Sequence, residues 1–174
     1  TYTPEPALGS ILRAVKLPSV GGDTAFASMY AAYDALSEPL RTMLDGLTAE
    51  HDVSKSARRG IRAGHLKADL ADIQKRLPPA THPVIRTHPE TKRKLLFVNV
   101  NSTVRINELS EDESDTLLHF LFNHVKLPDF QMRHGWEEGD LVFLDNRCAQ
   151  HYAVPDYHER RILHRVTIKG DRPY

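Results

Sequence analysis

The segment 145–165, DNRCAQHYAVPDYHERRILHR, gathers three histidines and four arginines in and before an apolar run. Residues 160–168, RRILHRVTI, read as a strand, and the side chains of a strand alternate between its two faces. Arg161 and Arg165 then share one face and lie at most about 13 Å apart. Guanidinium groups bind carboxylates or sulfonates in a planar, bidentate way. This face therefore predicts a site for two small anions, or for the two ends of one site.

His151 adds a different kind of chemistry to the same segment. We place it on a loop just before the strand, where a neutral imidazole facing the same cavity is a candidate metal ligand. A second interpretation stays open. The chain has ten histidines, most of which cannot be ligands, and the two arginines could instead pair with Asp145 or Glu159 at the surface.

The composition limits the classes of protein to consider. A chain of 174 residues fits one domain with a real core. Lys and Arg together number 23, as do Asp and Glu, so charge indicates neither a nucleic acid nor a membrane surface as partner. The single cysteine, Cys148, excludes an internal disulfide framework and favours the cytoplasm. No apolar run is long enough for a membrane span.

The pattern of apolar and turn residues predicts a mainly β protein with flanking helices. Strands are expected at 9–17, within 82–100, at 130–134, 140–145 and 160–168, with a short extended piece at 23–26. Helices are expected at 27–36, at 37–46, at 65–77 and after the capping box that starts at Ser110. Such an order favours a β-sandwich or jelly roll with helical cover.

Two further expectations follow from these elements. The cation-rich segment 54–79 is a candidate lid or excursion over the main sheet. The second face of the strand at 160–168 is mainly apolar, so we expect it to pack against helices, with His164 as a core histidine.

Three longer stretches closely resemble the taurine / 2,4-dichlorophenoxyacetate dioxygenase family. They are PSVGGDTAFASMYAAYDALSEPLRTMLDGLTAEHD, HPVIRTHPETKRKLLFVN and DNRCAQHYAVPDYHERRILHRVTIKGD, and the resemblance extends over essentially all 174 residues. It implies a double-stranded β-helix (jelly roll) and an oxygenase that depends on Fe(II) and 2-oxoglutarate.

The resemblance also implies roles for individual residues. His151 matches the distal histidine of the family's metal site, within DNRCAQH. Arg161 and Thr24 match the residues that hold the distal carboxylate of 2-oxoglutarate. Arg165 matches the arginine that binds the anionic group of the prime substrate, so the family pattern and the strand-face argument agree.

The sequence departs from the family at two places. The metal-binding motif W-H-[ST]-D-x-[TS]-[FY] has only its last two positions here, Thr1 and Tyr2, so we expect its histidine and aspartate to lie upstream. Residues 1–174 are then the C-terminal part of one jelly-roll domain that is incomplete at its N-terminus. Ser56 and Ser102 stand at or beside positions where the taurine enzymes carry aromatic residues, which indicates a larger, more polar substrate pocket.

The expected function is therefore hydroxylation of a small anionic substrate, with succinate and CO2 as co-products. The substrate is a sulfonate, a sulfate ester or a carboxylate rather than strictly taurine. Fe(II) is the expected cofactor, with 2-oxoglutarate and O2 as cosubstrates, in a cytoplasmic homo-oligomer (dimer or tetramer). The alternative is a non-catalytic jelly-roll protein that binds a small organic anion without iron.

Overall fold

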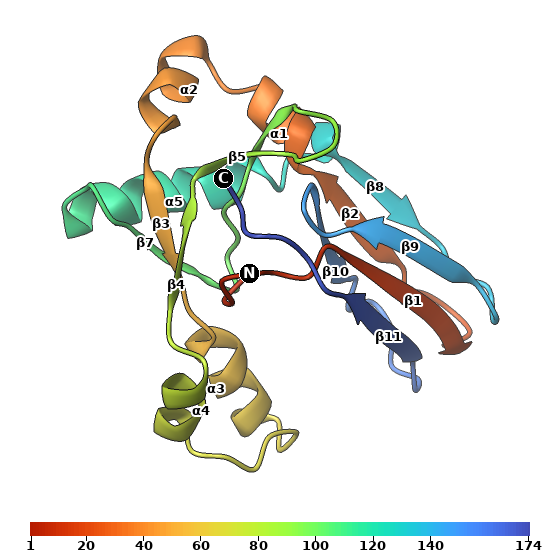
Figure 1. Cartoon of the computed structure of the whole chain (residues 1–174). Helices are drawn as coiled ribbons and strands as arrows, with labels where there is room; N and C mark the ends of the chain where they lie inside the picture. Colours follow the sequence, from red (N-terminus) through yellow and green to blue (C-terminus); the bar gives the residue numbers. More distant parts are fainter.

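Two three-stranded antiparallel sheets face each other and carry most of the predicted site (Figure 1). The computed structural model describes residues 1–174. The first sheet has the spatial order β11 (Ile162–Ile168), β1 (Gly9–Lys16) and β9 (Leu141–Asp145). The second has the order β10 (Ala149–Ala153), β2 (Thr24–Ser28) and β8 (Gln131–His134).

A small apolar cluster joins the two sheets. Along β1 the side chains alternate, so that Leu12 points inward while Ile11 and Arg13 point outward. Leu12 packs with Leu144 of β9 and with Phe26 of β2, which crosses from the other sheet. The inner faces of both sheets are thereby fixed opposite each other.

The rest of the chain forms a second layer around the main core. Its strands are β3 (Thr48–His51), β4 (Ala80–Pro83), β5 (Ile85–Thr87), β6 (Lys94–Leu96) and β7 (Thr103–Ile106). Its helices are α1 (Met29–Asp34), α2 (Glu38–Leu44), α5 (Glu111–His124) and a 3-10 turn at Pro128–Phe130. The prediction of a mainly β protein with flanking helices is confirmed, although the residue pattern does not predict β3 or β7.

Helix α5 forms as the sequence predicts. The backbone N–H of Ser110, the N-cap residue, donates to the Glu113 carboxylate at 3.0 Å. This is one of the two hydrogen bonds of a capping box. Leu118, Leu121 and Val125 lie on one helical face and are buried in the main core.

The segment 54–79 is a helical hairpin rather than one helix. Its helices are α3 (Ser54–Arg62) and α4 (Leu70–Arg76), and the hairpin projects away from the sheets (Figure 1). The prediction of a helix at 65–77 is wrong at its start, because the Asp69 side chain caps α4 by accepting from the N–H of Ala71. No helix of the chain is both long and apolar enough to cross a membrane.

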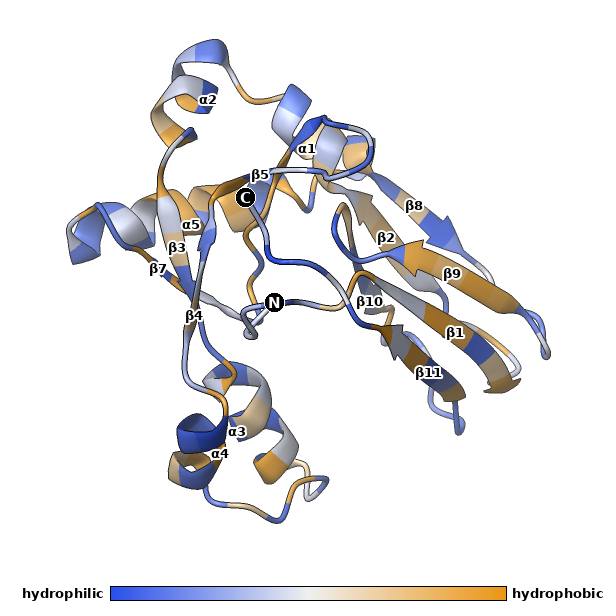
Figure 2. Ribbon diagram, viewed as in Figure 1, coloured by the Kyte–Doolittle hydropathy of each residue, from blue (hydrophilic) through white to orange (hydrophobic).

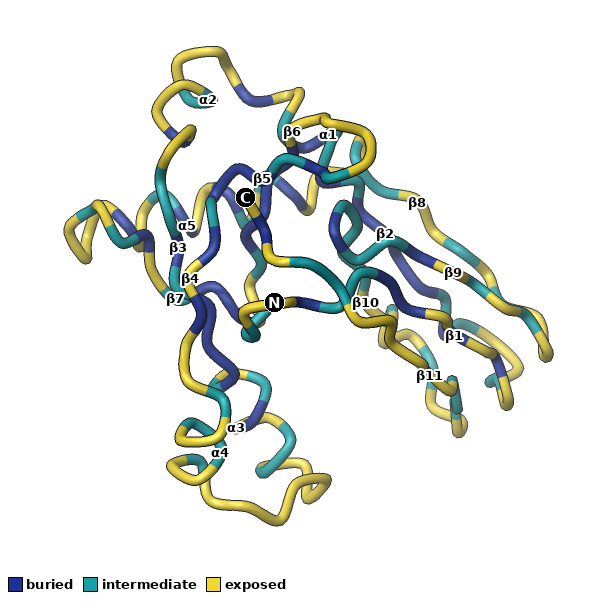
Figure 3. Tube along the Cα trace, viewed as in Figure 1, coloured by how far each residue is buried: buried dark blue, intermediate teal, exposed yellow.

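The outer face of the first sheet contradicts one expectation. Val166 and His164 of β11 are exposed instead of packed against helices, so His164 is not a core histidine. Phe143 of β9, on the same outer face but separated from β11 by β1, is exposed as well. Figure 2 colours much of these strands as hydrophobic, while Figure 3 shows β9 and β11 mostly accessible.

A buried histidine pair lies where β3 meets β4. The rings of His51 and His82 are 5.0 Å apart and both pack against Phe97. Burial, helped by the neighbouring His82, lowers the pKa of His51 to about 3. His51 is therefore held in the neutral form at neutral pH.

The burial of Leu121 predicts a large loss of stability on truncation. Leu121→Ala in the intact protein should lower the free energy of unfolding by about 2–5 kcal/mol, because the side chain is fully buried in the main core. Urea denaturation followed by circular dichroism measures it. Phe120→Ala, at a position 47% exposed on the same helix, is the control and should cost much less. Equal losses would contradict the placement of α5.

The low pKa of His51 predicts a dependence of stability on pH. Below its ordinary pKa of 6.5, the unfolded chain takes up a proton that folded His51 accepts only near pH 3, so stability falls as the pH falls through this window. The slope amounts to at most about 1.4 kcal/mol per pH unit. His51→Asn should flatten the curve of unfolding free energy against pH, whereas His119→Asn, at an exposed position, should not. If the curve of unfolding free energy against pH is unchanged in His51→Asn, the pH dependence does not come from His51.

Candidate functional site

His151 lies in the middle of β10, not on a loop as the sequence predicted. It pairs across the ladder with Phe26 of β2, and the two rings are 5.9 Å apart. Because Phe26 points into the space between the sheets, His151 points there too. AQHYA has little apolar alternation, so its sequence does not predict a strand, and its strand conformation depends on pairing with β2.

The sheets and the second layer line an open cavity of about 540 Å³. His151 and Arg165 both line it, from opposite sheets, and Ser102 lines it from the second layer. The structure thus brings together three of the residues that the sequence singled out.

The electrostatic environment keeps His151 neutral. Burial lowers the pKa of His151 below its ordinary value, and the positive charge of Arg165 lowers it further. A neutral imidazole offers a nitrogen lone pair, which is the form that binds a metal. His151 is thus the residue of this chain that fits a metal ligand in the cavity, and it fits by its donor chemistry.

Arg165 points inward from β11, where it pairs with Leu12 of β1. The alternative in which the arginines pair with Asp145 or Glu159 is not found. Asp145 is bound by Arg147, and Glu159 accepts from Ser19. The Arg165 guanidinium is therefore available for an anion.

Arg161 and Thr24 are in direct contact. The Nη2 group of Arg161 donates to Thr24 Oγ1 at 3.0 Å, and its Nε group donates to the carbonyl of Gly22 at 2.7 Å. Trp136 Nε1 donates to the same Thr24 oxygen at 2.9 Å. A hydroxyl has one proton and two acceptor sites, so Thr24 keeps its proton to donate, and Arg161 keeps three N–H groups. Both sets of donors suit a carboxylate.

The two serines have different positions. Ser102 is buried at the cavity wall, where its backbone N–H donates to the Asn99 side chain at 2.9 Å. Ser56 lies in α3 and donates to the carbonyl of Val53 at 2.8 Å. The structure does not bring Ser56 to the cavity that holds His151.

The sequence places Thr1 at the end of the family's metal-binding motif but does not predict its partners, nor Arg147 as a cavity residue. Thr1 lines the cavity and is held by Asn99 Nδ2, by His51 and, through its carbonyl, by His82. Arg147 also lines it, at the junction between the sheets. The available signal is the density of histidines in H-P and H-D pairs, such as His82 and His51, which lie outside the expected metal motif.

Curated relatives support the chemistry that this geometry indicates. An alpha-ketoglutarate-dependent sulfonate dioxygenase of Saccharomyces cerevisiae is 38% identical over 99% of this chain and 41% of its own length. An alpha-ketoglutarate-dependent 2,4-dichlorophenoxyacetate dioxygenase of Cupriavidus pinatubonensis is 39% identical over 93% of this chain and 55% of its own length. The chain thus spans about half the length of these relatives.

Solved structures and a family profile agree with the relatives. A crystal structure of a taurine dioxygenase from Burkholderia xenovorans superimposes with a TM-score of 0.83 at 34% identity, covering 99% of this chain and 56% of that one. The profile described as taurine catabolism dioxygenase TauD, TfdA family matches residues 1–167. The chain therefore belongs to the TauD/TfdA dioxygenase family.

Proposed function

We propose that the intact protein is an Fe(II)- and 2-oxoglutarate-dependent dioxygenase that hydroxylates a small anionic substrate. The observation that carries this proposal is the separation of two arginines. Arg161 is engaged with Thr24 at one end of the inner face, whereas Arg165 is unpaired in the cavity that holds His151. In this proposal each arginine binds a different anion, one the cosubstrate and the other the substrate.

We further propose that the two facing sheets are walls of a jelly roll of which residues 1–174 form the C-terminal part. Thr1 and Tyr2 align with the end of the family's metal-binding motif, and both line the cavity with His151. The missing histidine and aspartate ligands would then approach the cavity from the sequence before Thr1. This arrangement would complete a two-histidine, one-carboxylate site.

The proposal gives each site residue a specific role. His151 provides a neutral imidazole ligand, and its wall position in β10 fixes the direction of the ring. Arg161 and Thr24 donate to the distal carboxylate of 2-oxoglutarate and thereby orient the cosubstrate. Bound iron would supply the oxidation of 2-oxoglutarate by O2 to succinate and CO2, coupled to hydroxylation of the substrate.

Arg165 would hold the anionic group of the prime substrate, with Ser102, Asn99 and Asn101 as a polar wall beside it. This wall favours a sulfonate, a sulfate ester or a carboxylate over a substrate that needs aromatic packing. Ser56, which lies outside the cavity, does not contribute to this wall. The homo-oligomeric state and the cytoplasmic location stay predictions.

The alternative function is binding of a small organic anion without catalysis. It would leave Arg165 and Arg161 in place and would consume no 2-oxoglutarate. Because the relatives' names describe dioxygenases, the catalytic proposal is favoured.

The first test measures succinate formed from 2-oxoglutarate by the intact protein with Fe(II) under air, across a panel of sulfonates, sulfate esters and carboxylates. Arg161→Gln should raise the KM for 2-oxoglutarate by about 30-fold, because a charged hydrogen-bonded contact contributes about 2 kcal/mol. Arg160→Gln, at an exposed neighbouring position, is the matched control. No succinate with any substrate would favour the binding-protein alternative, and an unchanged KM would remove Arg161 from the cosubstrate site.

The second test separates the two arginines. Arg165→Gln should raise the KM for the prime substrate at least tenfold and leave the KM for 2-oxoglutarate within about twofold, since a lost charged contact is worth about 1.5–3 kcal/mol. The same substitution should raise the pKa of His151, measured by NMR titration of the metal-free protein, because a nearby positive charge is lost. Arg13→Gln, which points outward from β1, is the control. Equal damage to both KM values would contradict the division of roles.

A further inference from the structure

The junction between β9 and β10 connects the two sheets that carry the site. β9 belongs to the first sheet and β10 to the second, and residues 146–148 join them directly. Arg165 stands on the first sheet and His151 on the second. The conformation of this corner, residues 145–148, therefore influences how far apart the two side chains lie.

Asp145 is the centre of the corner. One oxygen of its carboxylate accepts from the backbone N–H of Arg147 at 2.8 Å, and the other accepts from Arg147 Nη2 at 2.6 Å. The Arg147 side chain is 6% exposed and also reaches Glu90 at 2.9 Å. Burial of a guanidinium needs such pairing, and the fork geometry of arginine makes the pairing directional.

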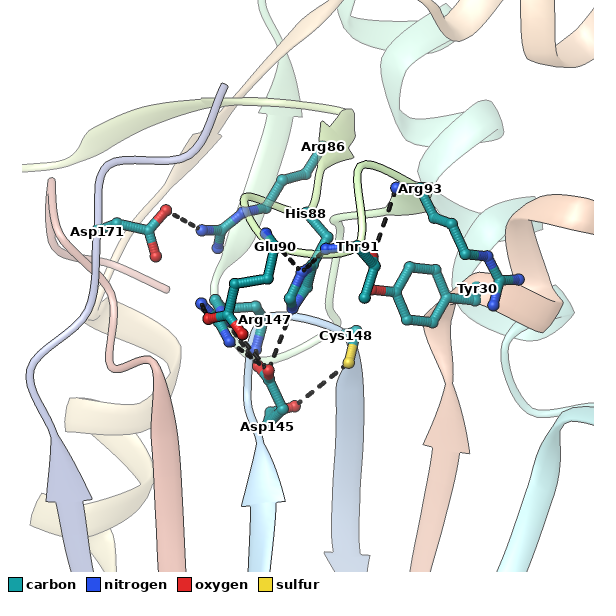
Figure 4. Close-up of polar contacts among 10 residues, drawn as sticks. All are labelled: Tyr30, Arg86, His88, Glu90, Thr91, Arg93, Asp145, Arg147, Cys148 and Asp171. Carbon is teal, nitrogen blue, oxygen red and sulfur yellow. Dashed lines mark hydrogen bonds and ion pairs between the residues drawn. The ribbon is translucent and has the colours of Figure 1, made fainter.

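His88 joins the corner to the second layer, as Figure 4 shows. Its Nδ1 atom accepts from the backbone N–H groups of Glu90 and Thr91, at 3.3 and 3.2 Å. The imidazole proton must then sit on Nε2, which donates to Asp145 at 3.1 Å. With the side chain 3% exposed, His88 holds one fixed tautomer and one fixed orientation.

The same side chains could be mistaken for a metal site, because ligand atoms of His88, Asp145 and Cys148 lie within 4.8 Å of one another. None of these ligand atoms is free to bind a metal. His88 Nε2 carries its proton, and the Asp145 oxygens hold Arg147. Burial raises the pKa of the Cys148 thiol, which disfavours the thiolate that binds metals. The cluster is a hydrogen-bonded support.

We propose that His88 and Arg147, acting through Asp145, are positioning residues that align Arg165 with His151. This inference rests on the proposed function, since it assigns to the corner the alignment of the substrate anion with the metal ligand. A displacement of about 1 Å at such a site is enough to disturb the reaction.

The position of the corner gives the inference a specific signature. Asp145 pairs with Gly9, which also pairs with Ile168 at the C-terminal end of β11. Arg161 precedes the opposite end of β11 and is fixed by Gly22 and Thr24. A disturbed corner should therefore affect the metal ligand and Arg165, and should leave the cosubstrate carboxylate site almost unchanged.

Two substitutions of His88 separate its two hydrogen bonds. In His88→Asn, the amide oxygen can replace Nδ1 as acceptor for the turn but does not reach Asp145. In His88→Gln, the longer amide N–H can replace Nε2 as the donor to Asp145. His119→Asn, at an exposed position of α5, is the matched control for the exchange itself.

The experiment uses the intact protein and measures Mn²⁺ binding by the EPR signal of the free ion. His88→Asn should weaken Mn²⁺ binding by about tenfold, because a shifted corner displaces His151, and lost support of a metal ligand typically costs about 10–100-fold in affinity. His88→Gln and His119→Asn should stay within about twofold, and so should the KM for 2-oxoglutarate in all three variants. Arg147→Lys, which loses the fork, should behave like His88→Asn and replaces it if that variant does not fold. Unchanged Mn²⁺ affinity in His88→Asn, or equal losses in both His88 variants, would overturn the inference.

A second measurement distinguishes failure of the inference from failure of the proposed function. If the wild-type protein binds no Mn²⁺, the proposed function fails. Crystal structures of the wild type and of His88→Asn then decide the inference alone. A change of about 1 Å or more in the separation of His151 and Arg165 supports positioning, and an unchanged separation contradicts it.

Discussion

The packing of Phe26 against Leu12 and Leu144 is the contact on which the rest of the site depends. It holds the inner faces of two three-stranded sheets opposite each other, and each buried side chain contributes roughly 1.5–3 kcal/mol. Because this cluster has only three buried members, it cannot fix the sheets by itself. The hydrogen-bonded corner at residues 145–148 and the ladder between β2 and β10 complete the connection.

With the sheets fixed in this way, the two arginines differ in their hydrogen-bond partners. Arg161 has two protein acceptors, Gly22 and Thr24, and retains donors for one carboxylate. Arg165 has no protein anion and lowers the pKa of His151, which stays neutral. Arg165 and the neutral imidazole of His151 share the cavity, and Arg161 lies outside its lining, against Thr24. This separation suits two acids around a metal better than it suits a single ligand.

Much of this arrangement could be predicted from the sequence. The alternation of RILHR correctly put Arg165 on the inner face, because a strand's faces follow from its period of two. The contact of Arg161 with Thr24 joins positions 137 residues apart, and only the family pattern gave a reason to connect them. The leucine stripe of α5 was readable because a long helix repeats its apolar spacing several times.

The failures have physical causes. The sequence does not predict β10, because its strand conformation is imposed by pairing with β2 and AQHYA has little strand pattern of its own. The outer face of β11 was expected to be covered, since periodicity shows which residues share a face but not what lies against it. Ser56 stays a predicted substrate residue: alignment cannot show where a side chain points, and in α3 its hydroxyl donates to the carbonyl of Val53, away from the cavity of His151.

The division of labour between the two arginines is the central claim, and a crystal structure of the intact protein with Mn²⁺ and N-oxalylglycine tests it most directly. We expect the metal at coordination distance from a ring nitrogen of His151. We also expect the distal carboxylate of N-oxalylglycine to bind Arg161 and Thr24, and the Arg165 guanidinium to stay free to bind a substrate anion in the cavity. A metal bound away from His151, or that carboxylate on Arg165, would contradict the separate roles of the two arginines.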